Sequence, residues 1–405
     1  MKLKFIDSML EIGQERWLQL DIPPSPFLRF EFLQGLEAYG CVGEHVGWIP
    51  HHLLVEDEVS SELLGFMPLY IKYNSYGELV FDWAWADAYQ RAGRDYYPKL
   101  VSAIPYTPVT GPRILTNPSV CREQLQKEVI GAVVEEAKKF NYSSVHCLFP
   151  DQTESQQFSQ FKFVTRLGCQ FHWCNEGYQD FDDFLSRLNS RKRKNIKKER
   201  AKVSAGKFQF RILQGDEIED ELWPNIYHFY EKTFEEKGGY ATFTLPFFKH
   251  VSETMGDQLL VILAYENSLP VAAAIFYKDH DHLYGRHWGS LTQFDCLHFE
   301  VCYYLGIEYA IKHGIKHFEP GAQGEHKISR GFLPELTWST HWIKDHDFSL
   351  AIEQFVERER IYMKEYVYQL NKQSPFKVVE IPQEKNFNND FLSNWSLLKK
   401  CKPLK

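Results

Sequence analysis

Apolar residues recur at helical spacing and then at strand spacing near residue 140 of the chain. Leu125, Val129, Val133 and Ala137 share one face of a predicted helix. The apolar run SSVHCLFP follows it and ends at Pro150, which is typical of a short buried strand. This part of the chain is therefore predicted to fold as a helix followed by a strand.

The same order of elements returns downstream. One face of a second predicted helix is marked by Phe299, Cys302, Gly306 and Tyr309, and the run IKHFEP follows as a strand that ends at Pro320. The two prolines lie 170 positions apart, and the aromatic runs GCQFHWC and WSTHWI follow them at an offset of 169. An internal repeat is therefore predicted.

Upstream of each helix the pattern predicts a strand hairpin. LLGFMPLYIK and ELVFDWAW resemble LPVAAAIFYK and HLYGRHWG, which pairs Trp85 with Trp288 at an offset of 203. The first copy then carries about 33 extra residues, in the stretch ADAYQRAGRDYYPKLVSAIPYTPVTGPRIL. We expect an ordered loop or short extra strands there, serving either ligand binding or packing.

These patterns predict a mixed α/β fold, of the α+β type with mixed sheets, in two tandem domains. The first domain is placed at residues 1–180 and the second at 206–346. Between them, residues 181–205 are predicted as a basic helical linker, one helix from Phe181 to about Val203, ended by Gly206. Residues 347–405 are predicted as a C-terminal helix and tail, with helical spacing between Leu350 and Leu370.

Composition supports a folded protein and narrows its class. The chain is 44% hydrophobic and 16% aromatic, which excludes a disordered protein. Its 405 residues are more than a single hydrophobic core usually supports. The formal charge of -8 argues against a surface coated with basic residues for nucleic acid. The first residues lack the apolar core of a signal peptide, and no run of about 18 apolar residues occurs. We therefore expect a soluble cytoplasmic protein without membrane insertion.

Four features together resemble one known family. They are the repeat, the linker SRKRKNIKKERAKV, the insert segment YTPVTGPRI and the block FEPGAQGEHKISRGFLPELTWSTHW. Together they resemble the FemAB-like family of N-acyltransferases, often described as peptidoglycan biosynthesis proteins, over roughly Phe27 to Lys344. The resemblance implies two GNAT-like domains and transfer of an acyl or aminoacyl group to an amine on a small molecule or peptide, with a cell-wall precursor as one candidate. Acyl-CoA and aminoacyl-tRNA are the implied donors, which makes tRNA a candidate partner, and no firm cofactor is implied.

One segment departs from the acetyl-CoA enzymes that this resemblance includes. Their pyrophosphate loop presents spaced glycines so that backbone N–H groups can face phosphate. Here the segment is GSLTQFDCLHFE, with Gln293 but no glycine after Gly289. The first copy holds Gln90, Arg91 and Gly93 in WADAYQRAGRD, which surface polarity explains equally well. We therefore predict poor coenzyme A binding in the second domain.

The second domain is expected to carry the chemistry. In GNAT-like folds the strands matching HLYGRHWG and IKHFEP diverge and hold substrate between them. Alternation places Tyr284, Arg286 and Trp288 on one face and His287 on the other. Glu319 ends its strand, and we consider it either a general base or the acceptor of an ion pair from an arginine. His287 is a further candidate for catalysis.

The stretch FEPGAQGEHKISRGF gathers polar residues directly after an apolar strand. Two glycines, Gly321 and Gly324, permit a tight turn with exposed N–H groups, and four polar side chains able to hold an anionic substrate follow the strand: Gln323, His326, Lys327 and Arg330. We predict a substrate site here rather than a solvated turn. Glu300, in the first turn of its helix, is a secondary catalytic candidate that the helix dipole also explains.

The first domain is expected to bind the acceptor. Its candidates are Trp83, Trp85 and Asp87, with Tyr106 and Arg113 from the insert, although the aromatic residues also suit a core. The linker contains eight basic residues and one acidic residue. Arg191, Lys194 and Lys198 are candidates for phosphate binding, and the alternative is that they form a solvated helix face.

Two rival functions stay open. The first is a nucleic-acid-binding protein that keeps the acyltransferase fold without catalysis. The second is a metal-dependent hydrolase built on His280, Asp281, His282 and His287, whose spacing fits no zinc motif, so that no metal site is predicted. No GxSxG segment and no paired Cys–His signature of a covalent nucleophile occurs.

Overall fold

Fifteen strands form two sheets in the computed structural model, which describes residues 1–291, 294–322 and 324–377. The strands are β1 (Lys2–Ile6), β2 (Trp48–Pro50), β3 (His52–Glu56), β4 (Leu63–Met67), β5 (Tyr70–Lys72), β6 (Lys99–Ser102), β7 (Leu115–Thr116), β8 (Ser144–Leu148), β9 (Val164–Cys174), β10 (Gln209–Gln214), β11 (Leu259–Glu266), β12 (Leu269–Lys278), β13 (His282–Ser290), β14 (His317–Glu319) and β15 (Leu333–Ile343). The smaller sheet has the order β1-β3-β4-β7. The larger sheet has eleven strands in the order β10-β11-β12-β13-β14-β9-β15-β8-β6-β5-β2.

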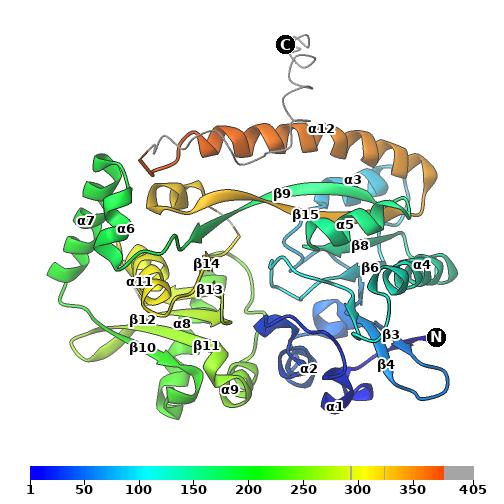
Figure 1. Cartoon of the computed structure of the whole chain (residues 1–405), viewed down its shortest axis with the longest axis horizontal. Helices are drawn as coiled ribbons and strands as arrows, with labels where there is room; N and C mark the ends of the chain where they lie inside the picture. Colours follow the sequence, from blue (N-terminus) through cyan, green and yellow to red (C-terminus); the bar gives the residue numbers. More distant parts are fainter. Residues whose placement is uncertain (292–293, 323, 378–405) are drawn as a thin grey trace, which may run out of the picture.

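Helices cover these sheets in both halves of the chain. They are α1 (Gln14–Trp17), α2 (Phe30–Ala38), α3 (Trp83–Arg91), α4 (Arg122–Lys139), α5 (Gln152–Ser159), α6 (Phe181–Arg187), α7 (Ser190–Ala205), α8 (Trp223–Glu236), α9 (Leu245–Thr254), α10 (Leu297–Phe299), α11 (Leu305–Lys312) and α12 (His346–Asn371). A π-helical turn, Glu300–Tyr304, joins α10 to α11. The predicted terminal helix is confirmed as α12, which lies along the two longest strands (Figure 1).

The two halves exchange strands. Strand β9, from the first half, pairs with β14 of the second, and β15, from the second half, pairs with β8 of the first. β9 and β15 also pair with each other over nine positions. In Figure 1 these two strands run from one lobe to the other beneath α12. One sheet therefore passes through both halves, while the boundaries placed at residues 180, 205 and 346 stay predictions.

The predicted order of a helix followed by a strand is present in both halves, as α4 then β8 and as α11 then β14, and in each half that strand runs parallel to an earlier one. β6 runs parallel to β8 in the first half, and β13 runs parallel to β14 in the second. The prediction that pairs Trp85 with Trp288 is wrong, because Trp85 lies on α3 whereas Trp288 lies on β13. The counterpart of β13 is β6, which lies inside the segment predicted as an insert. That segment does contain short strands, as expected.

The linker forms two helices where the sequence predicted one. Leu188 has an extended backbone, so α6 ends before it. The side chain of Asn189 accepts a hydrogen bond from the Lys192 N–H and begins α7 as its N-cap. The helical propensity of both segments was visible in the sequence, but the extended residue between them was not.

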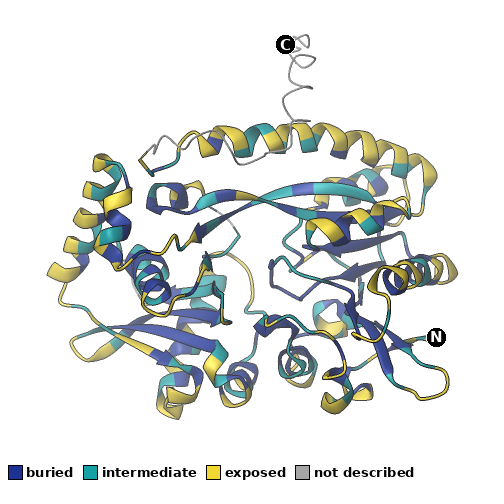
Figure 2. Ribbon diagram, in the orientation of Figure 1, coloured by how far each residue is buried: buried dark blue, intermediate teal, exposed yellow. Residues whose placement is uncertain are grey.

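Aromatic side chains join the halves into one core. Phe27 of the first half lies with its ring centroid 5.1 Å from Tyr277 and 5.1 Å from Tyr284 of the second. Phe32 on α2 packs against Phe247 on α9 at 5.4 Å. Figure 2 shows buried residues continuing from strand to strand, with exposed residues on the outer face of α12. The halves are therefore held side by side by packing as well as by strand exchange.

Candidate active site

The candidate site is a cavity where β13 and β14 stop pairing. The strands run parallel up to the pair Tyr284↔Glu319, after which β14 ends and Pro320 follows. β13 continues to Ser290, and a cavity of about 340 Å³ opens between the diverging segments. Its walls come from α8, β12, β13, the π-helical turn and the loop after β14.

A β-bulge sets which side chains of β13 face the cavity. Ile275 pairs with His287 and Phe276 pairs with Gly285, so Arg286 is an extra residue on β13. The predicted alternation is therefore wrong. His287 shares a face with Tyr284, and Trp288 lies on the opposite face, whereas the sequence placed Trp288 beside Tyr284. The bulge brings Arg286, His287 and Trp288 together at one cavity wall.

The glycine turn after β14 carries a buried lysine. Gly321 and Gly324 have φ of 92° and 118°, a backbone region that side chains with a Cβ rarely adopt. Lys327 is only 3% exposed and donates a hydrogen bond from Nζ to the Gly321 carbonyl at 2.7 Å. Burial and then the charge of Arg286 lower the pKa of Lys327 to about 8. The turn therefore places an amine that can change charge near neutral pH in the cavity wall.

Arg286 and Glu319 form a buried ion pair behind this wall. Arg286 Nη2 lies 3.3 Å from Glu319 Oε2, and the two side chains are 5% and 10% exposed. Arg286 Nη1 also donates to the Gly285 carbonyl, while Arg286 Nε has no hydrogen-bond partner among the described residues. Burial lowers the pKa of Arg286. Glu319 therefore acts as an ion-pair acceptor here, one of the two roles that the sequence suggested.

Three imidazoles line the cavity, and burial favours the neutral form of each. Burial and then Arg286 lower the pKa of His287 to about 3, and its Nε2 has no partner among the described residues. Burial lowers the pKa of His298 to about 4 and also lowers that of His326. His326 Nε2 lies 2.9 Å from the hydroxyl of Tyr303, which fixes the ring at the cavity edge.

Five predicted residues of the second half do not line this cavity: Tyr284, Glu300, Glu319, Gly324 and Arg330. Glu300 is buried against Arg200, with 2.7 Å between Arg200 Nη2 and Glu300 Oε1, and burial raises its pKa. Arg330 pairs with Glu199 at 2.9 Å and covers the ring of Phe299. These groups hold the helices around the site together, so the structure gives no support to a catalytic role for Glu300. Position 323, predicted as a substrate ligand, and position 293 of the predicted phosphate loop lie outside the described residues.

The candidates of the first half do not reach this cavity. Trp83 is 40% exposed and Asp87 is exposed, both on α3, while Trp85 is buried with its ring centroid 4.9 Å from that of His341. The Tyr106 hydroxyl donates to the Cys41 carbonyl at 3.0 Å. Arg113 is fully buried and donates to four backbone carbonyls, those of Val109, Gly111, Pro112 and Leu148. These contacts shape the first half and its insert.

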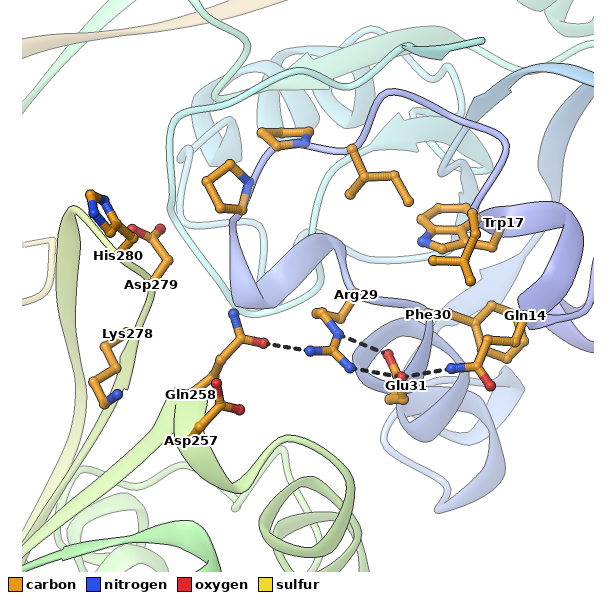
Figure 3. A pocket seen from close by; sticks show the side chains of 14 residues that line it. Gln14, Trp17, Arg29, Phe30, Glu31, Asp257, Gln258, Lys278, Asp279 and His280 are labelled. Atoms are coloured by element: carbon orange, nitrogen blue, oxygen red, sulfur yellow. Dashed lines mark hydrogen bonds and ion pairs between the residues drawn. The ribbon is translucent and has the colours of Figure 1, made fainter. Parts of the chain in front are cut away.

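Two further cavities lie between the halves. A cavity of about 600 Å³ has an apolar wall with Trp17 and Phe30 and a polar wall with Asp257 and Lys278 (Figure 3). Arg29 crosses it, donating to Glu31 and to Gln258 of the second half. A smaller cavity of about 140 Å³ shares three residues with the larger one, Pro23, Pro24 and Asp279.

The smaller cavity approaches the site from behind. Its lining includes Tyr284, Glu319 and Arg113, so the Arg286–Glu319 pair separates it from the cavity at Lys327. Tyr284 donates from its hydroxyl to Asp279 Oδ2 at 2.9 Å. The cavities between the halves therefore lead toward the reverse side of the candidate site.

The basic helix α7 packs beside the site and has an exposed outer face. Arg191, Lys194 and Lys198 are exposed, and no ion pair involves them within the part of the chain that the structure describes. The opposite face is engaged, because Arg200 binds Glu300 and Glu308. α7 also contacts the segment Glu325–Arg330, which carries Lys327.

Several residues that line the cavity were missed by the sequence reasoning. They are chiefly aromatic, namely Tyr230, Phe234, Phe276 and Tyr303, together with His298. Tyr230 and Phe234 lie one helical turn apart on α8, a spacing that equally suits a core helix. These residues are recognised as lining a site only from the packing of their helices and strands against one another. That packing is a tertiary feature, which the sequence pattern does not show.

The comparisons with known proteins agree with this architecture. The FemAB-like family, described as peptidoglycan biosynthesis/recognition, matches residues 8–378. The chain belongs to the FemAB-like family. Its fold is mixed α/β and GNAT-like.

Solved structures that are similar to this chain share little sequence with it. A conserved protein of unknown function from Bacteroides thetaiotaomicron is 11% identical, with a TM-score of 0.50, and the match covers 85% of this chain and 100% of that one. FemX is 12% identical with a TM-score of 0.49, covering 87% and 100%. A tandem GNAT protein of the clavulanic acid biosynthesis pathway is 10% identical with a TM-score of 0.45, covering 84% and 98%. No curated protein matches significantly.

Among residues 1–291, 294–322 and 324–377, no three His, Cys, Asp or Glu side chains gather in a way that could hold a metal ion. No helix in those same ranges has the length and apolar character needed to cross a membrane.

Proposed function

We propose that this FemAB-like protein is an N-acyltransferase that moves an acyl group from an activated donor to an acceptor amine in the cavity at Lys327. The observation that carries the proposal is the buried Lys327 ammonium, 3% exposed, in a cavity formed by diverging parallel strands. Acyl transfer needs a hydrogen-bond donor for the oxyanion that develops on the carbonyl, and Lys327 supplies one in a site shielded from water.

The reaction can be written with the groups that line the cavity. The lone pair of the acceptor amine attacks the donor carbonyl carbon, and the carbonyl π electrons move to oxygen. Lys327 Nζ donates a hydrogen bond to that oxyanion. When the oxyanion collapses, the bond to the leaving group breaks and Lys327 gives it a proton. The surplus proton of the new amide nitrogen then returns to Lys327, whose pKa of about 8 suits both directions of transfer.

The body of the acceptor is proposed to bind in the cavities between the halves, from which its amine reaches the cavity at Lys327 past the Arg286–Glu319 pair. Two carboxylates on this route, Asp257 and Asp279, form no ion pair with a lysine or arginine among the described residues and can attract a protonated amine, which gives one proton to solvent before its lone pair attacks. Glu319 is proposed as a positioning residue that keeps Arg286 in place between the two sides. The family description supports an amine on a peptidoglycan-type peptide as the acceptor. Arg113 is the one first-half candidate that lines this route.

The donor is proposed to be an acyl-CoA or an aminoacyl-tRNA, both of which carry phosphate. Gly289, the last glycine before the predicted phosphate loop, packs against α8, since a Cβ there would lie 1.7 Å from the Phe229 carbonyl oxygen. That glycine therefore serves packing. The exposed face of α7, with Arg191, Lys194 and Lys198, is the proposed phosphate contact.

The proposal is tested by amide formation with a panel of donors. Purified full-length protein is incubated with acyl-CoA or aminoacyl-tRNA donors and a lysine-containing peptidoglycan stem peptide, and the new amide is measured by mass spectrometry. Lys327→Met is expected to lower the rate by about 10²-fold or more. Lys312→Met, at an exposed position on α11, is the matched control and should stay within about twofold of wild type.

The outcomes separate the proposed function from its rival. A Lys327→Met rate equal to that of wild type would exclude the proposed role of the lysine. Salt-dependent RNA binding without amide formation from any donor would instead favour a binding protein built on the acyltransferase fold.

A further inference from the structure

The cavity at Lys327 has an uneven electrostatic character. Three cationic side chains line it, Lys237 at the exposed mouth and Arg286 and Lys327 in the wall, with three imidazoles between them. No aspartate or glutamate is among its described lining residues. A ligand group that enters this cavity therefore meets positive charge without a lining carboxylate to balance it.

Four carboxylates close to the lining residues in sequence have partners of their own. Glu236 lies 3.9 Å from Lys232, Glu300 lies 2.7 Å from Arg200 and Glu319 lies 3.3 Å from Arg286. Glu325 accepts a hydrogen bond from the Tyr366 hydroxyl at 2.5 Å. Glu319 neutralises Arg286, whereas Lys327 and Lys237 form no ion pair among the described residues.

Hydrogen-bonding capacity in the cavity is equally uneven. Arg286 Nε and His287 Nε2 are buried without partners among the described residues, and Lys327 uses one of its three N–H groups on the Gly321 carbonyl. Two backbone carbonyls of the cavity wall already accept hydrogen bonds, that of Gly285 from Arg286 and that of Trp288 from Thr233. The cavity therefore offers free N–H groups at Arg286 Nε and Lys327 Nζ, while each neutral imidazole can donate through one nitrogen and accept through the other.

We propose that this cavity takes the acyl end of the donor as a neutral or negatively charged group and discriminates against an acyl group that carries a free ammonium. An acyl carbonyl or a terminal carboxylate supplies the acceptors that the unpartnered N–H groups lack. An ammonium supplies only donors and adds a like charge beside Lys327. This proposal rests on the proposed transfer function, and it specifies the class of acyl group that is transferred.

The test uses three probes of nearly equal size that differ in charge. They are N-methylsuccinamate, N-methylbutanamide and N-methyl-β-alaninamide, which are negative, neutral and positive at pH 7. Binding to the full chain is measured by ligand-observed NMR titration. We expect the negative probe to bind about tenfold or more tightly than the positive one, with the neutral probe between them.

Two variants test whether the order of probe affinities arises in this cavity. In Lys327→Met the ratio between the negative and the positive probe should fall to about threefold or less, whereas Lys312→Met should keep the wild-type ratio. Thermal unfolding verifies that both variants are folded. If Lys327→Met does not fold, the order of the three probe affinities measured on the wild-type protein still tests the proposal.

Each outcome bears on the proposal separately from the transfer function. Binding of the positive probe as tight as that of the negative one, or binding of none of the three, overturns it. An amide product formed faster from a glycyl ester than from the matched acetyl or succinyl ester also overturns it while leaving N-acyl transfer intact. The expected order without any amide formation would instead support the cavity's selectivity and count against the transfer function.

Discussion

At the scale of single residues, the Arg286–Glu319 pair separates the candidate active site from the cavities between the halves. We predict that Glu319→Gln destabilises the protein by about 3 kcal/mol, because it leaves the buried Arg286 charge without a partner. Thermal unfolding measures this. Glu219→Gln, in an exposed pair with Arg211 at 2.9 Å, is the control and should leave the stability close to that of wild type.

The rate of the same variant distinguishes positioning from base catalysis. Glu319 does not line the cavity at Lys327, so Glu319→Gln should lower the transfer rate per folded molecule by less than about tenfold. A loss of about 10²-fold with unchanged stability would show instead that Glu319 is the general base.

Lys327 predicts a pH-dependent stability. Its pKa is about 8 in the folded protein and about 10.4 when unfolded, so the unfolded chain holds more protons between these values. Stability should therefore rise with pH through this window, and the cost of burying the charge is fully present below about pH 8. Lys327→Met should stabilise the protein at pH 7 by about 1–2 kcal/mol, after subtraction of the lost hydrogen bond to Gly321.

Thermal midpoints of both proteins at pH 7 and pH 10 measure that difference. The advantage of Lys327→Met should shrink toward pH 10, where the wild-type lysine is neutral in the folded state. A variant that is less stable than wild type at pH 7 would mean that Lys327 is not held at a lowered pKa.

The sequence predicted part of the site at this scale. The polar residues and glycines of the stretch after β14 predicted a turn that belongs to a substrate site, and the structure places Gly321, His326 and Lys327 in the cavity wall. The bulge at Arg286 could not be predicted, since it appears only when β13 is paired with β12. Glu300 and Arg330 could not be assigned either, because their partners lie on the linker, about 100 residues away or more.

At the scale of elements, α7 has one face that packs against the protein and one face that is exposed. We predict that Arg200→Ala destabilises the protein by about 3 kcal/mol, because it leaves the buried Glu300 unpaired. Lys198→Ala, two residues earlier on the exposed face, should change stability by less than about 0.5 kcal/mol. Urea unfolding compares the two, and equal losses would contradict this division of the helix.

Elements with a strong period were predictable, and those defined by pairing were not. The apolar stripes of α4 and α12 indicated their helices, and the apolar runs indicated β8 and β14. The run ELVFDWAW resembles a strand by its aromatic alternation, yet the helix α3 begins within it at Trp83. Trp85 packs on α3 against His341 from β15, a contact with the distant half that the local pattern does not show.

At the scale of the whole molecule, the exchanged strands make each half dependent on the other. Without the second half, β8 loses its partner β15 at residues Ser144–Leu148, and a buried strand edge becomes exposed. Without the first half, β14 loses β9 in the same way. The domains that the sequence suggests as successive units are therefore expected to fold only together.

A chain divided at Gly206, after α7, tests this dependence. Fragments 1–206 and 207–405 leave every strand intact, so co-expressed fragments should assemble through the pairing of β9 with β15 and co-purify as one complex. Each fragment expressed alone should aggregate or stay unfolded, because its apolar strand edge and half of the shared aromatic core are exposed. Circular dichroism and size-exclusion chromatography measure both states. A fragment that is monomeric and cooperatively folded by itself would show that the exchanged strands are dispensable for folding, and the halves would then be independent domains.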